Sequence, residues 1–205
     1  MTEEPKLIPR IAVRSIATGL FMMAFFTMMW AGIAYGSLQH GLPVLILFAL
    51  ISASFIGYGI YLFNISKLFP KLETEEDKAE GKTTGKWFGI IFGAEGLVIF
   101  VGINIVINIG HADLTIAVIA LVVGLHFYPL ARVFKRKIDY YLATWTTLIA
   151  IIAIILILNK TYSPVGVDAF LGIGVAIATS CYGAYMIARG CKLEKPVSAS
   201  PDIAL

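Results

Sequence analysis

Six long apolar segments separated by short polar segments make up most of the chain. Each reaches or nearly reaches the roughly 20 residues that a helix needs to cross about 30 Å of hydrocarbon. Apolar and polar residues do not alternate regularly, and backbone polar groups in lipid must be satisfied within their own segment, so helices are expected rather than strands. The pattern predicts an all-α polytopic bundle of six transmembrane helices at approximately residues 14–38, 42–66, 87–110, 113–131, 138–158 and 165–188.

Polar, glycine and proline residues mark the predicted breaks between these helices. The three outer turns are short, so consecutive helices are expected to pair as three hairpins. Residues 1–195 would form a single domain, and the Pro- and Ser-containing tail 196–205 is expected to be disordered. The breaks themselves fall at residues 39–43, 70–85, 110–113, 132–137 and 159–164.

The basic residues determine the expected orientation. Of the 16 Lys and Arg residues, all but Lys160 fall on one side of this topology. Basic residues remain on the cytoplasmic side, so both termini are predicted to be cytoplasmic. A cluster between the fourth and fifth helices is expected to attract anionic lipids of the inner leaflet. It consists of Arg132, Lys135, Arg136 and Lys137.

Composition agrees with a membrane protein and excludes some partners. Hydrophobic residues make up 59% of the chain, charged residues only 14%, and the mean hydropathy is +0.85. A soluble domain is nearer one quarter charged. The net charge of +3 does not indicate nucleic acid, because the basic residues are dispersed among short loops.

Glu95, within the predicted third helix, is the most informative residue. It lies nine residues after Lys86, which places it about 13 Å beyond the cytoplasmic end of the helix. A carboxyl group at that depth is costly and should face the interior of the bundle. Its role is either functional or that of a neutral hydrogen bond between helices.

His126, on the antiparallel fourth helix, is the expected partner of Glu95. It precedes Arg132 by six residues, about 9 Å along the helix from the same face of the membrane. The two side chains could then meet directly or through water, to relay protons, bind a cation or hold a polar head group. A purely structural hydrogen bond is the alternative.

Aromatic residues at similar depth complete the predicted ligand-binding set of Glu95, His126, Tyr61, Trp145 and Tyr185. Such rings either line a pocket or belong to the aromatic belt found at membrane interfaces, and the belt is the commoner reading. Within the membrane the sequence has no HExxH, GxSxG, paired-Asp or two-His haem motif. No catalytic residue, metal or cofactor is therefore predicted, and an intramembrane enzyme is the least favoured class.

Glycines form two spaced patterns. Gly85, Gly89 and Gly93 make two consecutive GxxxG steps, and Gly32 and Gly36 make another. Such faces indicate close helix contact, either within the chain or in a homo-oligomer.

A possible internal repeat relates the inner ends of three helices. Residues 59–69 can be aligned with residues 124–134 at an offset of 65 residues, and residues 183–189 carry a fainter version. Three similar hairpins or convergence of helix-end composition would both explain it.

The segment 124–134, with sequence GLHFYPLARVF, resembles one found in small bacterial multi-pass membrane proteins that remain uncharacterised. The segment 92–96, FGAEG, is similar to that group as well. The resemblance implies the bacterial cytoplasmic membrane and places Glu95 and His126 in one pattern, but it implies no activity. The expected function is transport or binding of a small molecule, ion or proton, with a structural or assembly subunit as the alternative.

Overall fold

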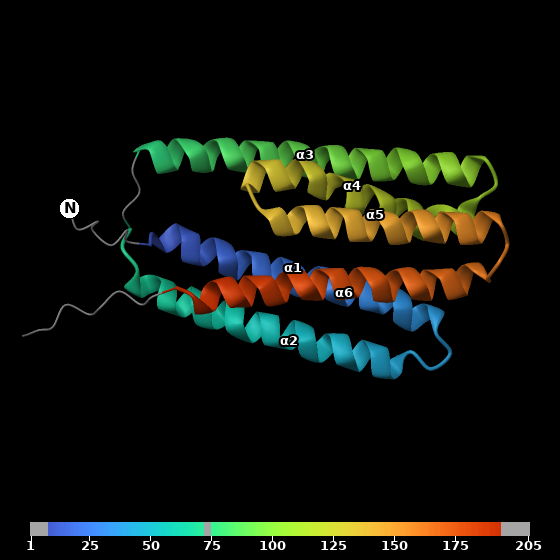
Figure 1. Ribbon diagram of the computed structural model, residues 1–205, viewed down its shortest axis with the longest axis horizontal. Coiled ribbons are helices and arrows are strands. Elements are labelled where there is room, and N and C mark those ends of the chain that lie inside the picture. Colours follow the sequence, from blue (N-terminus) through green and yellow to red (C-terminus); the bar gives the residue numbers. More distant parts are fainter. Residues whose placement is uncertain (1–7, 72–74, 194–205) are drawn as a thin grey trace, which may run out of the picture.

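The computed structural model describes residues 8–71 and 75–193, and its secondary structure is helical (Figure 1). The predicted tail 196–205 lies outside the described residues. Short 3-10 turns η1 (Ser66–Leu68) and η2 (Ala112–Leu114) follow α2 and precede α4. The long helices are α1 (Arg10–Ser37), α2 (Leu42–Ile65), α3 (Glu75–Asn108), α4 (Thr115–Phe134), α5 (Lys137–Leu158) and α6 (Pro164–Cys191).

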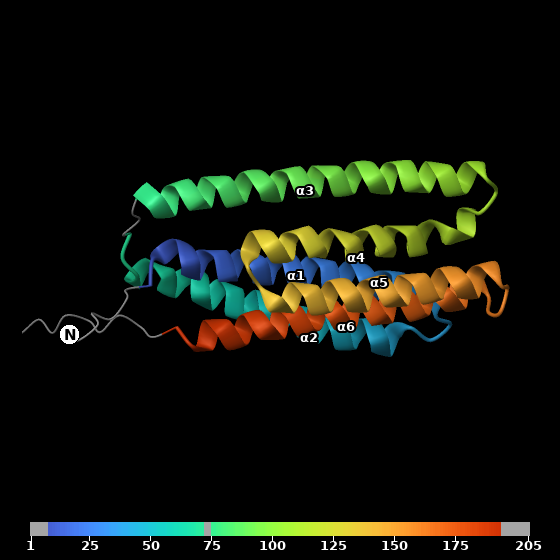
Figure 2. The same ribbon diagram turned by 45° about the horizontal axis from the view of Figure 1, so that its top comes forward.

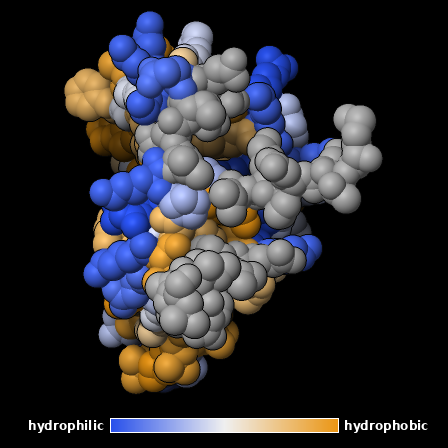
Figure 3. Space-filling view, turned by 90° about the vertical axis from the view of Figure 1, so that its left-hand side faces the viewer, coloured by the Kyte–Doolittle hydropathy of each residue, from blue (hydrophilic) through white to orange (hydrophobic). Residues whose placement is uncertain are grey.

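In the described part of the chain, six helices are long and apolar enough to cross a membrane, which confirms an all-helical fold with six candidate transmembrane helices. Large hydrophobic side chains remain exposed along the outside of the bundle, as a lipid environment requires. Helix α1 begins and helix α6 finishes at the same end of the bundle (Figure 1). Viewed from that end, hydrophilic residues gather over the helix ends and hydrophobic residues over the flanks (Figure 3).

Helices α1 and α6 pack extensively against each other in the middle of the bundle, and α4 packs in the same way against α5. Helix α2 covers α1 at one edge of the molecule. Helix α3 lies at the opposite edge, where its extensive contact within the described chain is with α4 (Figures 1 and 2). Helices α1 and α3 therefore face each other without close packing, and this arrangement leaves room for the candidate site.

The predicted break at residues 70–85 is wrong over most of its length. Helix α3 begins at Glu75 and continues without interruption to Asn108. Gly81 and Gly85 lower helix propensity but do not end a helix, since glycine keeps its backbone N–H donor. An ion pair of 2.7 Å between Lys78 Nζ and Glu75 Oε1 lies along this extension.

The glycines of the possible repeat each lie at a helix crossing. A Cβ on Gly59 would lie 3.0 Å from Phe21 of α1, one on Gly124 would lie 2.7 Å from the Thr147 backbone nitrogen of α5, and one on Gly183 would overlap the Phe55 ring of α2. An internal repeat and convergent close packing both predict small residues at helix crossings, so these contacts agree with either explanation.

The GxxxG glycines behave differently. A Cβ added at Gly85, Gly89 or Gly93 would meet nothing within 4 Å, and the same holds for Gly32 and Gly36. These faces therefore make no close helix contact within the described chain.

Candidate functional site

A cavity of about 760 Å³ lies between α1, α3, α4, α5 and α6. Along α1 its wall extends from Ile11 to Trp30, a length of about 28 Å at 1.5 Å per residue. Most of the wall is formed by Met, Phe, Ile, Leu and Val side chains. Arg14 and Arg136 line the cavity toward the end of the bundle at which α1 begins, and this end is called the mouth below.

Glu95 of α3 and His126 of α4 meet on the wall of this cavity. Glu95 Oε1 lies 3.2 Å from His126 Nδ1, and the two side chains are 10% and 8% exposed. The antiparallel packing of α3 on α4 brings together two positions that the sequence placed at similar depth. The pair is thus largely withdrawn from the surface while lining the cavity.

The ring nitrogens of His126 have separate environments. Nδ1 lies within hydrogen-bonding distance of the Val123 carbonyl oxygen, which can only accept. Nδ1 is therefore assigned the hydrogen, which it donates to the Val123 carbonyl, while Glu95 Oε1 lies 3.2 Å from the same nitrogen. Nε2 has no hydrogen-bond partner among the described residues, so a neutral ring presents it as a proton acceptor.

Aromatic rings and a proline lie beside His126. The Phe92 ring meets the imidazole edge to face at 5.6 Å between centroids, and the Phe127 ring lies 4.3 Å from it in a tilted arrangement. Pro129 stands inside α4 and cannot donate to the carbonyl of Leu125, so the helix lacks one backbone hydrogen bond beside the site. This part of α4 carries its polar residue in an apolar, aromatic setting.

The other three predicted binding residues lie outside the cavity. Tyr61 of α2 is exposed beside Tyr58, and the Tyr185 hydroxyl of α6 accepts from Arg189 at the end of that helix. Trp145 Nε1 donates to the Gly174 carbonyl at 3.0 Å while the ring remains half exposed. The structure brings Glu95 and His126 together and leaves these three rings apart from them.

Three charged residues near the mouth were not predicted as site residues. Arg14 and Arg136 line the cavity, although the sequence indicated only a role in topology or lipid attraction. Asp139, in the first turn of α5, is 1% exposed, and within the described chain neither of its carboxylate oxygens makes a hydrogen bond of ordinary geometry. It lies beside Arg136 and the Tyr182 hydroxyl. The sequence signal for Asp139 as a site residue was its position: an acidic residue shortly after a basic cluster, at the start of a predicted membrane helix.

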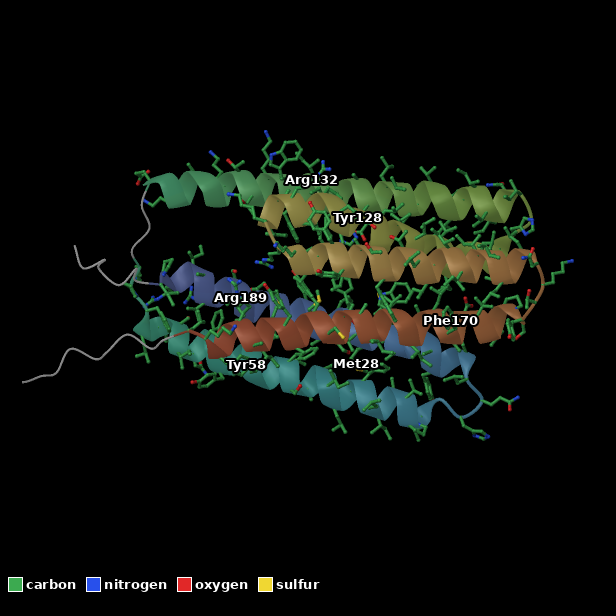
Figure 4. The ribbon with its side chains drawn as sticks, viewed as in Figure 1. Met28, Tyr58, Tyr128, Arg132, Phe170 and Arg189 are labelled. Atoms are coloured by element: carbon green, nitrogen blue, oxygen red, sulfur yellow. The ribbon has the colours of Figure 1, made fainter. Side chains whose placement is uncertain are left out.

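The predicted basic cluster divides into two parts. Arg132, Lys135 and Lys137 are exposed, whereas Arg136 is half-buried and turns inward, where Nη1 donates to the Tyr182 hydroxyl at 3.1 Å. Lys135 takes a left-handed conformation, with φ of 53°, that ends α4 and leads directly into α5. Figure 4 shows Arg132 on the same half of the bundle as Arg189, with Phe170 toward the opposite end.

Comparison of the chain with protein-family models, with curated proteins and with solved structures gives no match. Within the described residues, no group of three or more His, Cys, Asp or Glu side chains is arranged to hold a metal ion.

Proposed function

We propose that this protein binds a small molecule in the cavity and transports it, with protons exchanged at the Glu95–His126 pair. The observation that carries the proposal is an ionisable pair, largely buried, on the wall of a cavity of about 760 Å³. Pockets that bind small molecules have volumes of about 300–1,000 Å³ and combine apolar walls with a few polar groups. The cavity has these features.

The proton role rests on the chemistry of the cavity wall. Ionisable groups inside a membrane are costly and commonly form proton relays. Arg14, Arg136 and Tyr182 also line the wall, but a guanidinium keeps its proton and a phenol ionises only in alkaline solution. Glu95 and His126 are the carboxyl and imidazole groups of the wall, the side-chain types that form proton relays inside membranes, and the unpartnered Nε2 is a natural point of entry.

Orientation and location belong to the same proposal. The mouth would face the cytoplasm, with both termini inside and the helices arranged as three hairpins, because the basic residues concentrate at this end. The resemblance of segment 124–134 supports a bacterial cytoplasmic membrane. The exposed residues Arg132, Lys135 and Lys137 would attract anionic lipids of the inner leaflet.

One observation favours a structural or assembly subunit as a second candidate. Gly85, Gly89 and Gly93 form a face of α3 that meets no other part of the described chain. Such faces allow helices of separate chains to approach closely. A partner or a second copy could occupy it without preventing the cavity from binding a ligand.

Binding in the cavity can be tested with Trp30 as the reporter, because its side chain lines the cavity and the residue is only 1% exposed. Replacing the exposed Trp87 and Trp145 by Phe leaves one tryptophan in the chain. The probes are ω-bromohexadecanoyl taurine and its neutral analogue ω-bromohexadecanoyl ethylamide, since bromine quenches indole fluorescence on contact. We expect saturable quenching of Trp30 in phosphatidylcholine nanodiscs by at least one probe.

A matched control measures partition into the bilayer. The chain with Trp30 and Trp87 replaced by Phe retains only the half-exposed Trp145, which should show non-saturable quenching. If Trp30 is quenched by neither probe, or only in the non-saturable manner of Trp145, the proposed binding is wrong.

A further inference from the structure

The charges on the cavity wall are unevenly distributed. Two guanidinium groups, Arg14 and Arg136, line the mouth, and the carboxyl group on the wall, Glu95, already contacts His126. Within the described chain, neither arginine lies within 4.0 Å of a carboxylate oxygen. The mouth therefore carries two guanidinium groups without a carboxylate oxygen in ion-pair contact, while the rest of the wall is mainly apolar.

Arg136 has the stronger claim to bind a ligand. A guanidinium offers five N–H donors, and the described residues engage one from Arg136, which donates to the Tyr182 hydroxyl. The Phe134 ring lies 4.8 Å from its central carbon and holds the planar group in place. The remaining donors suit the oxygens of a carboxylate, sulfonate or phosphate.

Asp139 supports Arg136 from within the protein. Its carboxylate is buried beside the guanidinium, yet no hydrogen bond joins them. Because no hydrogen bond joins the two groups, the N–H groups of Arg136 that do not contact Tyr182 stay available to a ligand. Asp139 itself does not line the cavity, so it would not meet the ligand directly.

Arg14 contributes more weakly to the same mouth. Its Nε donates to Ser66 Oγ at 3.3 Å, and its guanidinium lies over the Phe63 ring at 5.0 Å, which turns the group toward α2. Its positive charge still makes the electrostatic potential at the mouth more positive. A smaller effect is therefore expected from Arg14 than from Arg136.

The cavity dimensions match a ligand with one charged end. From Arg14 to Trp30 the wall covers 16 residues of α1, about 24 Å at 1.5 Å per residue, and Met22, Met23 and Phe26 lie between. We infer that the ligand is an anionic amphiphile whose charged head lies at Arg136 and Arg14 and whose apolar body extends toward Trp30. This inference names the ligand class of the proposed binding site and rests on that proposal.

The taurine and ethylamide probes test the inference, because they have the same brominated acyl group and the same amide and differ only by the sulfonate of taurine. In the chain that retains only Trp30, the taurine probe should saturate quenching at a concentration at least about tenfold lower than the ethylamide, since one charge-assisted contact is worth that much. Arg136→Gln should remove this preference and leave ethylamide binding near the wild-type value. A merely structural role for Arg136 would weaken both probes alike.

Arg132→Gln is the matched control, because Arg132 lies at the same end of the bundle but is exposed and does not line the cavity (Figure 4). It should leave the preference intact. The inference is overturned if wild type binds both probes equally, or if Arg132→Gln removes the preference as Arg136→Gln does. Failure of both probes would instead remove the proposed function.

The same brominated acyl group, attached to bilayer lipids, shows whether the anionic ligand is a membrane lipid or a free amphiphile. Nanodiscs containing ω-bromohexadecanoyl phosphatidylglycerol are compared with nanodiscs containing the corresponding phosphatidylcholine. Stronger quenching of Trp30 by phosphatidylglycerol would assign the site to an anionic membrane lipid. Equal, weak quenching by both lipids, together with saturation by the taurine probe, would assign it to a free amphiphile. Either result agrees with the inference that the cavity binds an anionic head group.

Discussion

Replacing Gly96 by Phe is expected to abolish quenching of Trp30 by the bromo probes. Gly96 lines the cavity on α3, and a Cβ at this position meets nothing within 4 Å. A phenyl ring can therefore extend into the open space without displacing the backbone or a neighbouring helix. The ring would occupy volume that the apolar body of the ligand needs.

Gly93→Phe supplies the matched control, because Gly93 lies one turn away on the same helix, has equally open surroundings and does not line the cavity. It should bind both probes as wild type does. Equal loss of binding in the two variants would indicate disturbance of α3 rather than filling of the cavity. Unchanged binding in Gly96→Phe would show that the ligand does not occupy this space.

Replacing Glu95 by Gln is expected to abolish proton movement while retaining ligand binding. The amide keeps the side-chain volume and an oxygen that can lie beside His126 Nδ1, but it cannot exchange a proton near neutral pH. Proteoliposomes loaded with the pH indicator pyranine would receive ω-bromohexadecanoyl taurine from outside. Its sulfonate stays ionised, so the probe does not carry protons across the bilayer by itself. Wild type should change the internal pH, and Glu95→Gln should match protein-free vesicles.

Glu75→Gln provides the comparison for this experiment, since Glu75 is an exposed carboxylate on the same helix, paired with Lys78. It should move protons as wild type does. Proton movement at the wild-type rate in Glu95→Gln would contradict the proton role, while saturable quenching of Trp30 would still support binding. The two parts of the proposed function can thus fail separately.

The membrane helices could be predicted from the sequence because hydrocarbon demands long apolar segments, and this demand is local. Helix α2, predicted at residues 42–66, is observed as Leu42–Ile65, and helix α5, predicted at residues 138–158, is observed as Lys137–Leu158. The beginning of α3 was missed because its first turns are polar and contain glycine. Polar residues beyond the membrane can continue a helix, so hydropathy alone does not locate its end.

The contact of Glu95 with His126 followed from depth and from the short connection between α3 and α4. The cavity did not follow, because its existence depends on how far α3 stays from α1, which is a property of tertiary packing. The inward orientation of Arg136 also depends on tertiary packing and could not be predicted from the sequence. The sequence places it in a basic cluster, but only the left-handed turn at Lys135 and the packing of α6 direct it toward Tyr182 rather than outward.

The aromatic residues illustrate why depth is an insufficient guide to a site. Tyr61 and Tyr185 were predicted at the depth of a pocket, and they lie outside the cavity on α2 and α6. Trp145 is directly followed by Thr146, which does line the cavity. Successive positions on a helix are separated by about 100°, so one residue decides whether a side chain faces the cavity.

An electron cryomicroscopy structure of the full chain in a lipid nanodisc, with a bound antibody fragment to aid alignment, would test the central claim most directly. We predict that α3 packs on α4 while an open cavity separates it from α1, with the Glu95 carboxyl group and the His126 ring in contact on the cavity wall. A map in which α3 closes onto α1, or in which either side chain points into the surrounding lipid, would contradict this account.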